Sequence, residues 1–159
     1  MSFTTADLYD QFESEVRVAL PGFQDYGGKR RFYGAISTLR VFEDNSLVRQ
    51  TLENPGAGRV LVIDGGESLR CALVGDRLAL LARDNDWNGI IVSGCVRDSA
   101  VIAEIDIGVK ALATSPRKSV KRNSGELDIP VNFSGVTFSP GEYVYVDEDG
   151  ILISTRSLF

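Results

Sequence analysis

Two short segments carry the residues of this chain that are best suited to chemistry. The first, Gly94-Cys95-Val96-Arg97-Asp98, directly follows an apolar run, 90–96, that is typical of a strand buried on both faces. In parallel sheets, ligands gather beyond the carboxyl ends of the strands. There Arg97 could grip a carboxylate with two hydrogen bonds, and Asp98 could hold a metal ion or a metal-bound water. The alternative is a surface Arg–Asp ion pair with a helix cap, and these residues alone leave the two interpretations evenly balanced.

The second segment, Val74-Gly75-Asp76-Arg77-Leu78, places a glycine and an acid at the start of a predicted helix, 76–87. Backbone N–H groups at a helix start lack partners within the helix, so they suit a bound carboxylate or phosphate. Asp76 could instead simply cap its own helix. This segment alone favours the simpler interpretation.

Histidine is absent from the sequence, and only two cysteines, Cys71 and Cys95, are present. This composition removes Ser-His-Asp and Cys-His nucleophilic catalysis and also zinc sites built from histidine or cysteine. Acid–base or metal chemistry must therefore use carboxylates, lysine, tyrosine, cysteine or bound water. A metal held by carboxylate and water would be a hard cation such as Mg²⁺ or Mn²⁺. Cys95 adjoins the first segment, but a small cysteine packed on a strand is more common than a reactive one.

Length and composition are those of an ordinary globular protein. The 159 residues fit one domain, 1–159, and 43% of them are hydrophobic. No stretch approaches the roughly 18 apolar residues of a membrane span, and the first residues lack the pattern of a secretory signal. Since two cysteines give no disulfide framework, we expect a cytoplasmic protein without membrane association.

The formal net charge of −5 argues against direct binding of nucleic acid, which requires a basic face. One basic cluster interrupts the acidic background and comprises Arg117, Lys118, Lys121 and Arg122. Such a run is usually a solvated loop, and the sequence favours that interpretation. The functional alternative is a loop that faces an anion or bridges subunits.

Hydrophobic periodicity and turn residues predict an α/β fold. Helices are expected at 6–12, 45–53, 76–87 and 98–104, the first capped by Thr4 or Thr5. Apolar runs predict buried strands at 59–64, 90–96 and 109–114, and alternation over 35–42 predicts a strand with one covered face. Four short strands separated by turn signals follow at 131–133, 136–138, 143–147 and 151–154. The sequence therefore predicts parallel strands covered by helices, with a β-rich C-terminal part.

The spacing of the two chemical segments resembles a known pattern. Asp76 is followed by twenty residues and then by Arg97-Asp98. This arrangement is similar to the Asp-x20-Arg-Asp motif of the family that contains the regulator of ribonuclease E activity A (RraA) and the class II 4-hydroxy-4-methyl-2-oxoglutarate aldolases. Further similar stretches lie at 42–45, 62–66, 88–92, 106–112 and 135–142, so the resemblance covers nearly the whole chain.

The resemblance implies a swivelling β/β/α fold assembled as a homotrimer, with sites between neighbouring subunits. It also implies that Arg97 binds the carboxylate and oxo group of a small 2-oxo acid. Asp98 would anchor Mg²⁺ or Mn²⁺, largely through water. The backbone of Gly75, Asp76, Arg77 and Leu78 would cradle the carboxylate, and Asp76 would orient a catalytic water. Cleavage of a C–C bond beside a carbonyl leaves a pyruvate enolate, whose charge a metal ion and an arginine can stabilise. Such a site requires the Gly75 turn and Arg97 to lie within roughly 15 Å, since pockets for small ligands are compact.

One departure from the pattern bears on the reaction. Aldolase-competent members resemble Arg-Asp-x2-Glu/Asp, whereas Val101 stands at that position here and Glu104 is the next acid. The chain also ends at Phe159, without the longer C-terminal segment of some aldolases in the family. Both features favour decarboxylation of oxaloacetate over retro-aldol cleavage, because loss of CO₂ depends less on a precisely positioned acid–base group. A different class of function is a protein regulator that binds and inhibits ribonuclease E, to whose basic segments an acidic protein could bind.

Overall fold

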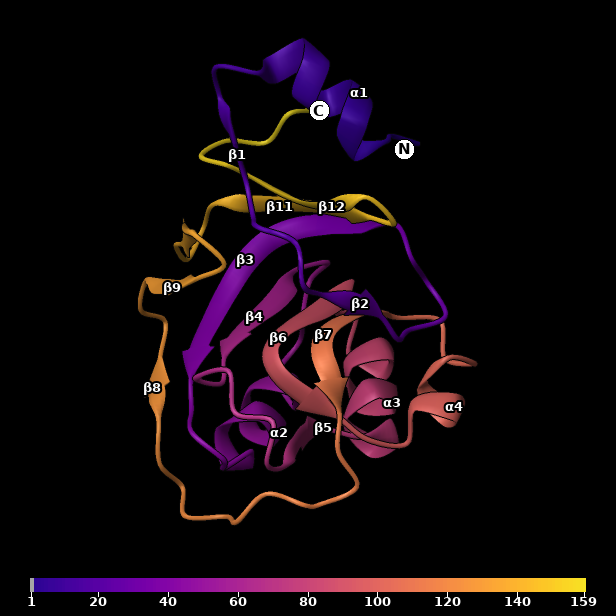
Figure 1. Ribbon diagram of the computed structural model, residues 1–159, viewed down its shortest axis with the longest axis vertical. Coiled ribbons are helices and arrows are strands. Elements are labelled where there is room, and N and C mark those ends of the chain that lie inside the picture. Colours follow the sequence, from indigo (N-terminus) through magenta and orange to yellow (C-terminus); the bar gives the residue numbers. More distant parts are fainter. Residues whose placement is uncertain (1) are drawn as a thin grey trace.

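A mixed sheet of ten strands organises the computed structural model, which describes residues 2–159 (Figure 1). Its main path runs β1-β12-β11-β3-β4-β6-β7-β2, with β5 paired to β6 and β8 to β3. The helices are α1 Thr5–Phe12, α2 Ser46–Leu52, α3 Asp76–Asp84 and α4 Ser99–Ile102. The strands are β1 Val16–Val18, β2 Gln24–Asp25, β3 Phe32–Arg40, β4 Val60–Asp64, β5 Ala72–Val74, β6 Gly89–Val96, β7 Gly108–Thr114, β8 Glu126–Leu127, β9 Val131–Phe133, β10 Val136–Phe138, β11 Tyr143–Asp147 and β12 Gly150–Ser154.

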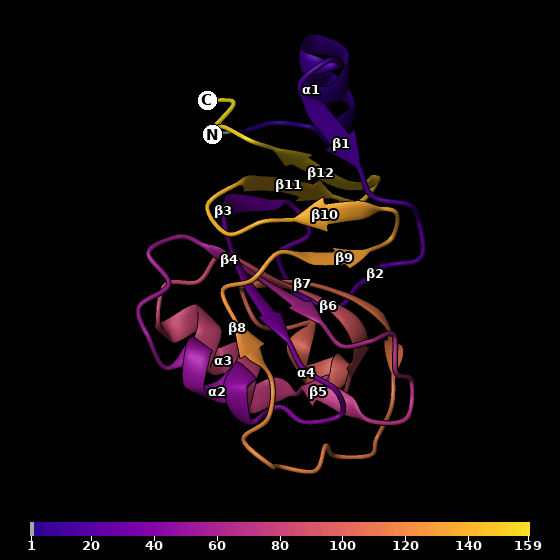
Figure 2. The same cartoon turned by 90° about the vertical axis from the view of Figure 1, so that its left-hand side faces the viewer.

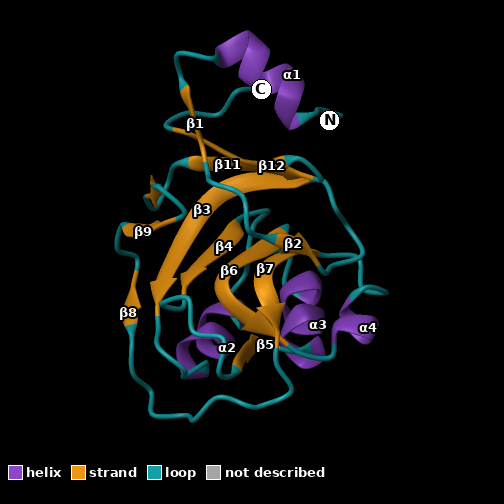
Figure 3. Cartoon of the chain, in the orientation of Figure 1, coloured by secondary structure: helices purple, strands orange, loops and turns teal. Residues whose placement is uncertain are grey.

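The central strands β3, β4, β6 and β7 run parallel, as predicted from the alternation of apolar runs and helices. Helices α2, α3 and α4 gather at one end of the molecule, and α1 lies at the opposite end beside both termini (Figure 3). The predicted C-terminal strands are confirmed as β9 to β12, where β11 and β12 form an antiparallel pair and β9 and β10 form a separate hairpin. The expected mixed α/β architecture with a β-rich C-terminal part is therefore observed.

Strand β4 is buried on both faces, as its continuous apolar run predicts. Leu61 and Ile63 pack into a cluster with the helices, whereas Val60 and Val62 belong to a second cluster on the other face. The β9–β10 hairpin contributes to that second cluster and lies beside the sheet in Figure 2. Because both faces are covered, the carboxyl ends of these strands are where the sheet opens to solvent and to ligands.

Strand β3 departs from the prediction of a single covered face. Ser37 and Thr38 are as buried as their apolar neighbours. Their hydroxyl groups are satisfied, since Arg59 Nη1 donates to Ser37 Oγ at 2.7 Å and Thr38 Oγ1 donates to the carbonyl of Ile129 at 2.5 Å. The strand also joins two parts of the sheet, pairing antiparallel with β11 over its first half and parallel with β4 over its second. The polar residues Ser37 and Thr38 of this strand are therefore buried and hydrogen-bonded, and do not form an exposed face.

The predicted helices form; α1 begins one residue earlier than expected, and the other three are shorter than predicted. Thr4 caps α1 by accepting the N–H of Asp7. Helix α3 ends at Asp84, three residues before the expected end, because Trp87 leaves the helix and is buried beneath it with its indole N–H donating to the carbonyl of Asn54 at 3.0 Å. Within residues 2–159, no helix combines the length and apolar character needed to cross a membrane.

Candidate active site

Strands β5 and β6 bring the two chemical segments together. They run parallel with Val74 opposite Val96, and the N–H of Arg97 donates to the carbonyl of Val74 at 3.0 Å. A β-carbon placed on Gly75 would lie 3.0 Å from Asp98 Oδ2 and 3.6 Å from Arg97 Cγ. The expected proximity of the Gly75 turn and Arg97 is confirmed, and the absence of a side chain at Gly75 permits it.

Helix α3 begins at this junction without a side-chain cap. Its N-cap residue is Gly75, and Asp76 is the first helical residue. The interpretation of Asp76 as the cap of its own helix is therefore wrong. Its Oδ1 accepts the N–H of the adjacent Arg77 at 2.9 Å, and the N–H of Asp76 points to Asp98 Oδ2 at 3.4 Å. The positive end of the helix dipole therefore adjoins the Arg97–Asp98 segment, an arrangement that attracts anions.

Asp98 and Arg97 do not form the surface ion pair that was the alternative interpretation. No salt bridge joins them in the described chain, and Asp98 occupies the N-cap position of α4 without a side-chain cap bond. Asp98 also has a left-handed backbone, with φ 60° and ψ 38°. Residues other than glycine adopt this conformation at a cost that often marks a functional site. Arg97 makes one long bond, from Nη1 to the carbonyl of Pro116 at 3.4 Å. Both charged groups remain available to a ligand.

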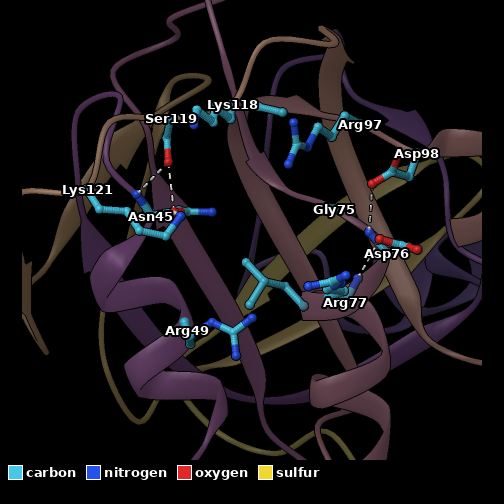
Figure 4. Close-up of a pocket in the computed structure, with 12 residues that line it drawn as sticks. Asn45, Arg49, Gly75, Asp76, Arg77, Arg97, Asp98, Lys118, Ser119 and Lys121 are labelled. Atoms are coloured by element: carbon cyan, nitrogen blue, oxygen red, sulfur yellow. Dashed lines mark hydrogen bonds between the residues drawn. The ribbon is translucent and has the colours of Figure 1, made fainter.

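These residues line one pocket of about 680 Å³ (Figure 4). Its lining consists of Asn45, Arg49, Ala72, Gly75, Asp76, Arg77, Leu78, Arg97, Asp98, Lys118, Ser119 and Lys121. Every residue expected at the site from the sequence is present in this set. Five cationic side chains and two carboxylates face the cavity, which gives it a net formal charge of +3. On a chain with net charge −5, this pocket concentrates positive potential and favours anionic ligands.

Two residues of the basic cluster line the pocket, and the other two lie in the solvated part of the loop. Lys118 and Lys121 line the pocket, so this part of the loop faces the cavity. Arg117 and Arg122 are exposed and do not line it, as expected for a solvated loop. The sequence provided no means of choosing between these neighbours, because each is a single cation in an irregular segment.

Asp44 holds the loop 119–124 against the start of α2. Its side chain, 1% exposed, accepts the N–H and hydroxyl of Ser46 and the N–H groups of Arg122 and Ser124. Burial by itself would raise the pKa of Asp44, but the hydrogen bonds from Ser46, Ser124 and Arg122 outweigh it and lower the pKa to about 2. Asp44 is thus a charged anchor for the segment that carries the lysines of the pocket.

The donor set fits a hard cation that keeps most of its water. Within residues 2–159, no three metal-ligating side chains cluster. A site formed only by protein ligands is therefore not available in one copy of the chain. Mg²⁺ is commonly held by one or two carboxylates with several waters retained. Asp98, with Asp76 across the junction, offers this type of ligation.

Three neighbours contribute no chemistry to the pocket. Cys95 is fully buried on β6, where burial raises the pKa of its thiol, so it is a packing residue as expected. Val101 is 49% exposed on α4, and neither Val101 nor Glu104 lines the cavity. Within the described chain, Asp76 and Asp98 are the carboxylates that line the cavity.

A family described as Aldolase/RraA matches residues 5–153. The chain belongs to the RraA-like family. A protein of Aromatoleum aromaticum named "Putative 4-hydroxy-4-methyl-2-oxoglutarate aldolase" is 57% identical to it over 158 residues, covering 99% of both chains. The resemblance inferred from the Asp-x20-Arg-Asp spacing is thereby confirmed.

Two solved structures share the fold of this RraA-like protein. The RNA-processing inhibitor RraA from Thermus thermophilis superposes with a TM-score of 0.96 at 45% identity, covering 100% of this chain and 96% of that one. A structure named S-adenosylmethionine:2-dimethylmenaquinone methyltransferase, from Geobacillus kaustophilus, gives a TM-score of 0.96 at 50% identity, covering 98% and 97%. The large mixed sheet is therefore the fold of RraA structures.

Proposed function

We propose that this RraA-like protein is a divalent-metal-dependent carbon–carbon lyase that acts on small 2-oxo acids and releases pyruvate. Its substrates are 4-hydroxy-4-methyl-2-oxoglutarate and, by decarboxylation, oxaloacetate. One observation carries the proposal: Arg97, Asp98 and the uncapped start of α3 line the same cationic pocket. The name of the relative from Aromatoleum aromaticum supports the aldolase assignment.

Each residue has a role that its position supports. Arg97 binds the carboxylate and oxo oxygen of the 2-oxo acid, because a guanidinium can donate to both at once. The backbone around Gly75, Asp76, Arg77 and Leu78 cradles the same carboxylate at the helix start. Asp98 holds Mg²⁺ or Mn²⁺, which when bound supplies positive charge against the negative charge that develops on the oxo oxygen. Asp76 orients the water that exchanges protons with the substrate.

Both reactions break the bond between C3 and C4 of the substrate. In the aldol cleavage, the C4 hydroxyl gives its proton to a base, C4 becomes the carbonyl of one pyruvate, and the bonding electrons form the enolate of a second pyruvate. In the decarboxylation, C4 leaves as CO₂ and the electrons form the same enolate. Protonation at C3 then gives pyruvate. The positive charge on Arg97 stabilises the negative charge of the enolate in both cases.

The remaining expectations extend this proposal. A homotrimer of the swivelling β/β/α class would let a neighbouring subunit complete the pocket. That neighbour is the source we propose for an acid–base group in the aldol reaction, since Val101 replaces the acid of the motif and does not line the cavity. The cytoplasm is the location we propose, because two cysteines give no disulfide framework.

The decisive experiment measures pyruvate formation from each substrate with Mg²⁺ and with an excess of chelator, after subtraction of the rate without protein. We expect the protein-dependent rate to require the metal. Arg97→Ala and Asp98→Asn should lower kcat/KM by about a hundredfold or more, since each removes charge that stabilises the transition state. Arg83→Ala is the matched control, because Arg83 is exposed on α3, pairs with Asp84 and does not line the pocket. Equal rates for wild type and Arg97→Ala would refute the lyase.

A second candidate is inhibition of ribonuclease E, which the name of the Thermus structure favours. The acidic chain would bind basic segments of the nuclease, and that surface need not include Arg97. A pull-down at low salt tests this role, and failure to recover the nuclease would exclude it. Methyl transfer from S-adenosylmethionine, suggested by the name of the Geobacillus structure, is disfavoured by the pocket, because its net charge of +3 repels a sulfonium cation.

A further inference from the structure

A second pocket, of about 430 Å³, lies at the other edge of the parallel strands from the candidate active site. Its lining includes Phe3, Lys29, Arg31, Phe32, Tyr33 and Asn88. Phe32 opens β3 and Asn88 precedes β6, so the pocket adjoins the amino ends of these strands, whereas the active-site residues follow carboxyl ends. Figure 1 shows the N-terminus, whose first residues complete this pocket, at the end of the molecule opposite to α2 and β5. The two pockets share no lining residue.

Three aromatic rings form the floor of this second pocket. Phe3 and Phe32 are almost fully buried, and Tyr33 is partly exposed. The Phe32 ring lies against the first residues of β6 and β7, since β-carbons placed on Gly89 and Gly108 would lie 2.3 Å and 2.1 Å from its atoms. Glycine at both positions permits this close approach. Phe3 meets the Tyr33 ring edge-on, with centroids 5.7 Å apart. The floor is therefore apolar and fixed by packing, as suits a planar ring of a ligand.

Two cationic side chains line the same pocket without a strong partner. Lys29 is partly buried, and no ion pair involves it within residues 2–159. Arg31 lies 3.6 Å from Glu148, beyond hydrogen-bond distance, and both side chains are exposed enough for solvent to screen the pair. No carboxylate is among the described residues that line the pocket, so its formal charge is +2 on a chain of net charge −5.

Backbone and amide hydrogen bonds fix this cationic region to the sheet. The N–H of Lys29 donates to the carbonyl of Ile107 at 3.2 Å, directly before β7. Asn88 Nδ2 donates to the carbonyl of Tyr33 at 2.8 Å, which leaves one N–H of the amide for a ligand. Two cations and one amide donor thus line a single hollow, although they come from segments that are far apart in the chain. Donors held in this way lose less freedom on binding than unrestrained ones.

We infer that this pocket binds a small phosphate monoester that carries a planar ring, the chemistry of a nucleoside monophosphate. Lys29, Arg31 and Asn88 bind the phosphate, and the ring packs on the aromatic floor. A phosphate monoester has about two negative charges near neutral pH, which balance the +2 of the pocket, whereas a single carboxylate would leave one cation unneutralised. Its three acceptor oxygens provide one for each donor side chain.

Two further observations agree with this ligand class. The volume of about 430 Å³ lies in the range of pockets that bind small molecules. The position at the amino ends of the strands leaves the active-site pocket open while the ligand is bound. The inference is therefore independent of the proposed lyase function, and either can fail without the other.

Titration calorimetry of the full chain with adenosine monophosphate (AMP), inorganic phosphate and adenosine tests the site. We expect AMP to bind more tightly than either fragment, because it reaches both the cations and the floor. Lys29→Met and Arg31→Met should each weaken AMP binding by about tenfold or more, since each removes a charge-assisted hydrogen bond. Glu148→Gln should strengthen AMP binding, because it removes the carboxylate that competes for Arg31.

Two variants serve as controls. Arg30→Met removes an equal charge between the two cations in sequence, at an exposed position that does not line the pocket. At physiological ionic strength it should change AMP binding by no more than about twofold. Arg97→Ala removes a cation from the active-site pocket and should leave AMP binding as in wild type. Urea unfolding curves establish that each variant is folded.

The outcomes distinguish this pocket from general attraction of anions. A wild type that does not bind AMP refutes the site. An equal loss in Arg30→Met and Lys29→Met would assign the binding to diffuse surface charge, and a loss in Arg97→Ala would place the phosphate in the active-site pocket. Either result overturns the inference. Inorganic phosphate that binds as tightly as AMP would refute the role of the aromatic floor.

Discussion

Asp44→Asn should destabilise the folded chain by at least about 2 kcal/mol at neutral pH. The hydrogen bonds that Asp44 accepts lower its pKa from an ordinary value of 3.8 to about 2. Because each pKa unit corresponds to about 1.4 kcal/mol, this lowering amounts to about 2 kcal/mol of folding free energy carried by the charged form. An asparagine keeps one acceptor but turns an NH₂ group toward N–H groups that need an oxygen, so it cannot replace the carboxylate.

The stabilisation by Asp44 should depend on pH in a definite direction. Since the folded pKa lies below the unfolded one, the contribution of Asp44 is fully present above about pH 4 and is lost as the pH falls toward 2. Urea unfolding of the wild type and Asp44→Asn, measured from pH 7 to pH 3, should show a stability difference that is constant near neutrality and shrinks below pH 4. Asp10→Asn, an exposed position on α1, is the control. A difference that is the same at pH 3 as at pH 7 would refute the assignment of Asp44 as a charged anchor.

Three further changes test other parts of the structure. Gly75→Ala should raise the Mg²⁺ concentration for half-maximal activity about tenfold, while the melting temperature changes little. The added methyl group would lie 3.0 Å from Asp98 Oδ2 and displace that carboxylate by a few tenths of an ångström. Lys110→Met should cost about 3 kcal/mol in urea unfolding, since it leaves Asp25 without its partner at 2.9 Å, and adding Asp25→Asn should recover part of that loss. Trp87→Phe should cost about 1 kcal/mol in the same assay through loss of the indole hydrogen bond, and an unchanged stability would contradict the structure.

The elements that could be predicted from sequence are those with a strong local signal. Strands β4 and β6 are runs of apolar residues long enough to identify burial on both faces. The strands from β9 to β12 are delimited by glycine and proline turns, and their bounds agree with the prediction to within one residue. Turn chemistry acts over two or three residues, so it is fully visible in the sequence.

Elements fixed by distant partners were missed. Strands β1, β2 and β8 have two or three residues each, too few for a periodic pattern, and they form only because β12, β7 and β3 supply hydrogen-bonding edges. The end of α3 was placed too late for a related reason. Trp87 fits the helical pattern, but it gains more by burial beneath the helix than by extending it, and tertiary packing outweighs propensity of this size.

The residues of the site also differ in whether a local sequence signal marks them. Arg97 and Asp98 became candidates because they directly follow a buried strand, and Gly75 because it precedes a predicted helix. The resemblance to the family, through the Asp-x20-Arg-Asp spacing, then favoured them over a surface ion pair and a helix cap. The pocket wall that carries Asn45 and Lys121 has no such signature, since these two are 76 residues apart in the chain. Asn45 stands at the N-cap position of α2, yet its side chain bonds to this distant lysine and does not cap the helix.

The net charge of the chain bears on its surface as a whole but says nothing about the charge inside its pocket. An excess of five acidic charges argues against a broad basic face, which is why nucleic acid was not expected as a ligand. At physiological ionic strength, exposed charges are screened beyond about 8 Å. A small anion that has entered the cavity therefore responds to the five cations that line it rather than to the acidic exterior. The net charge of a chain therefore indicates which partners can bind over a wide surface. The ligand of a pocket depends instead on the few charged side chains that folding places within about 8 Å of it.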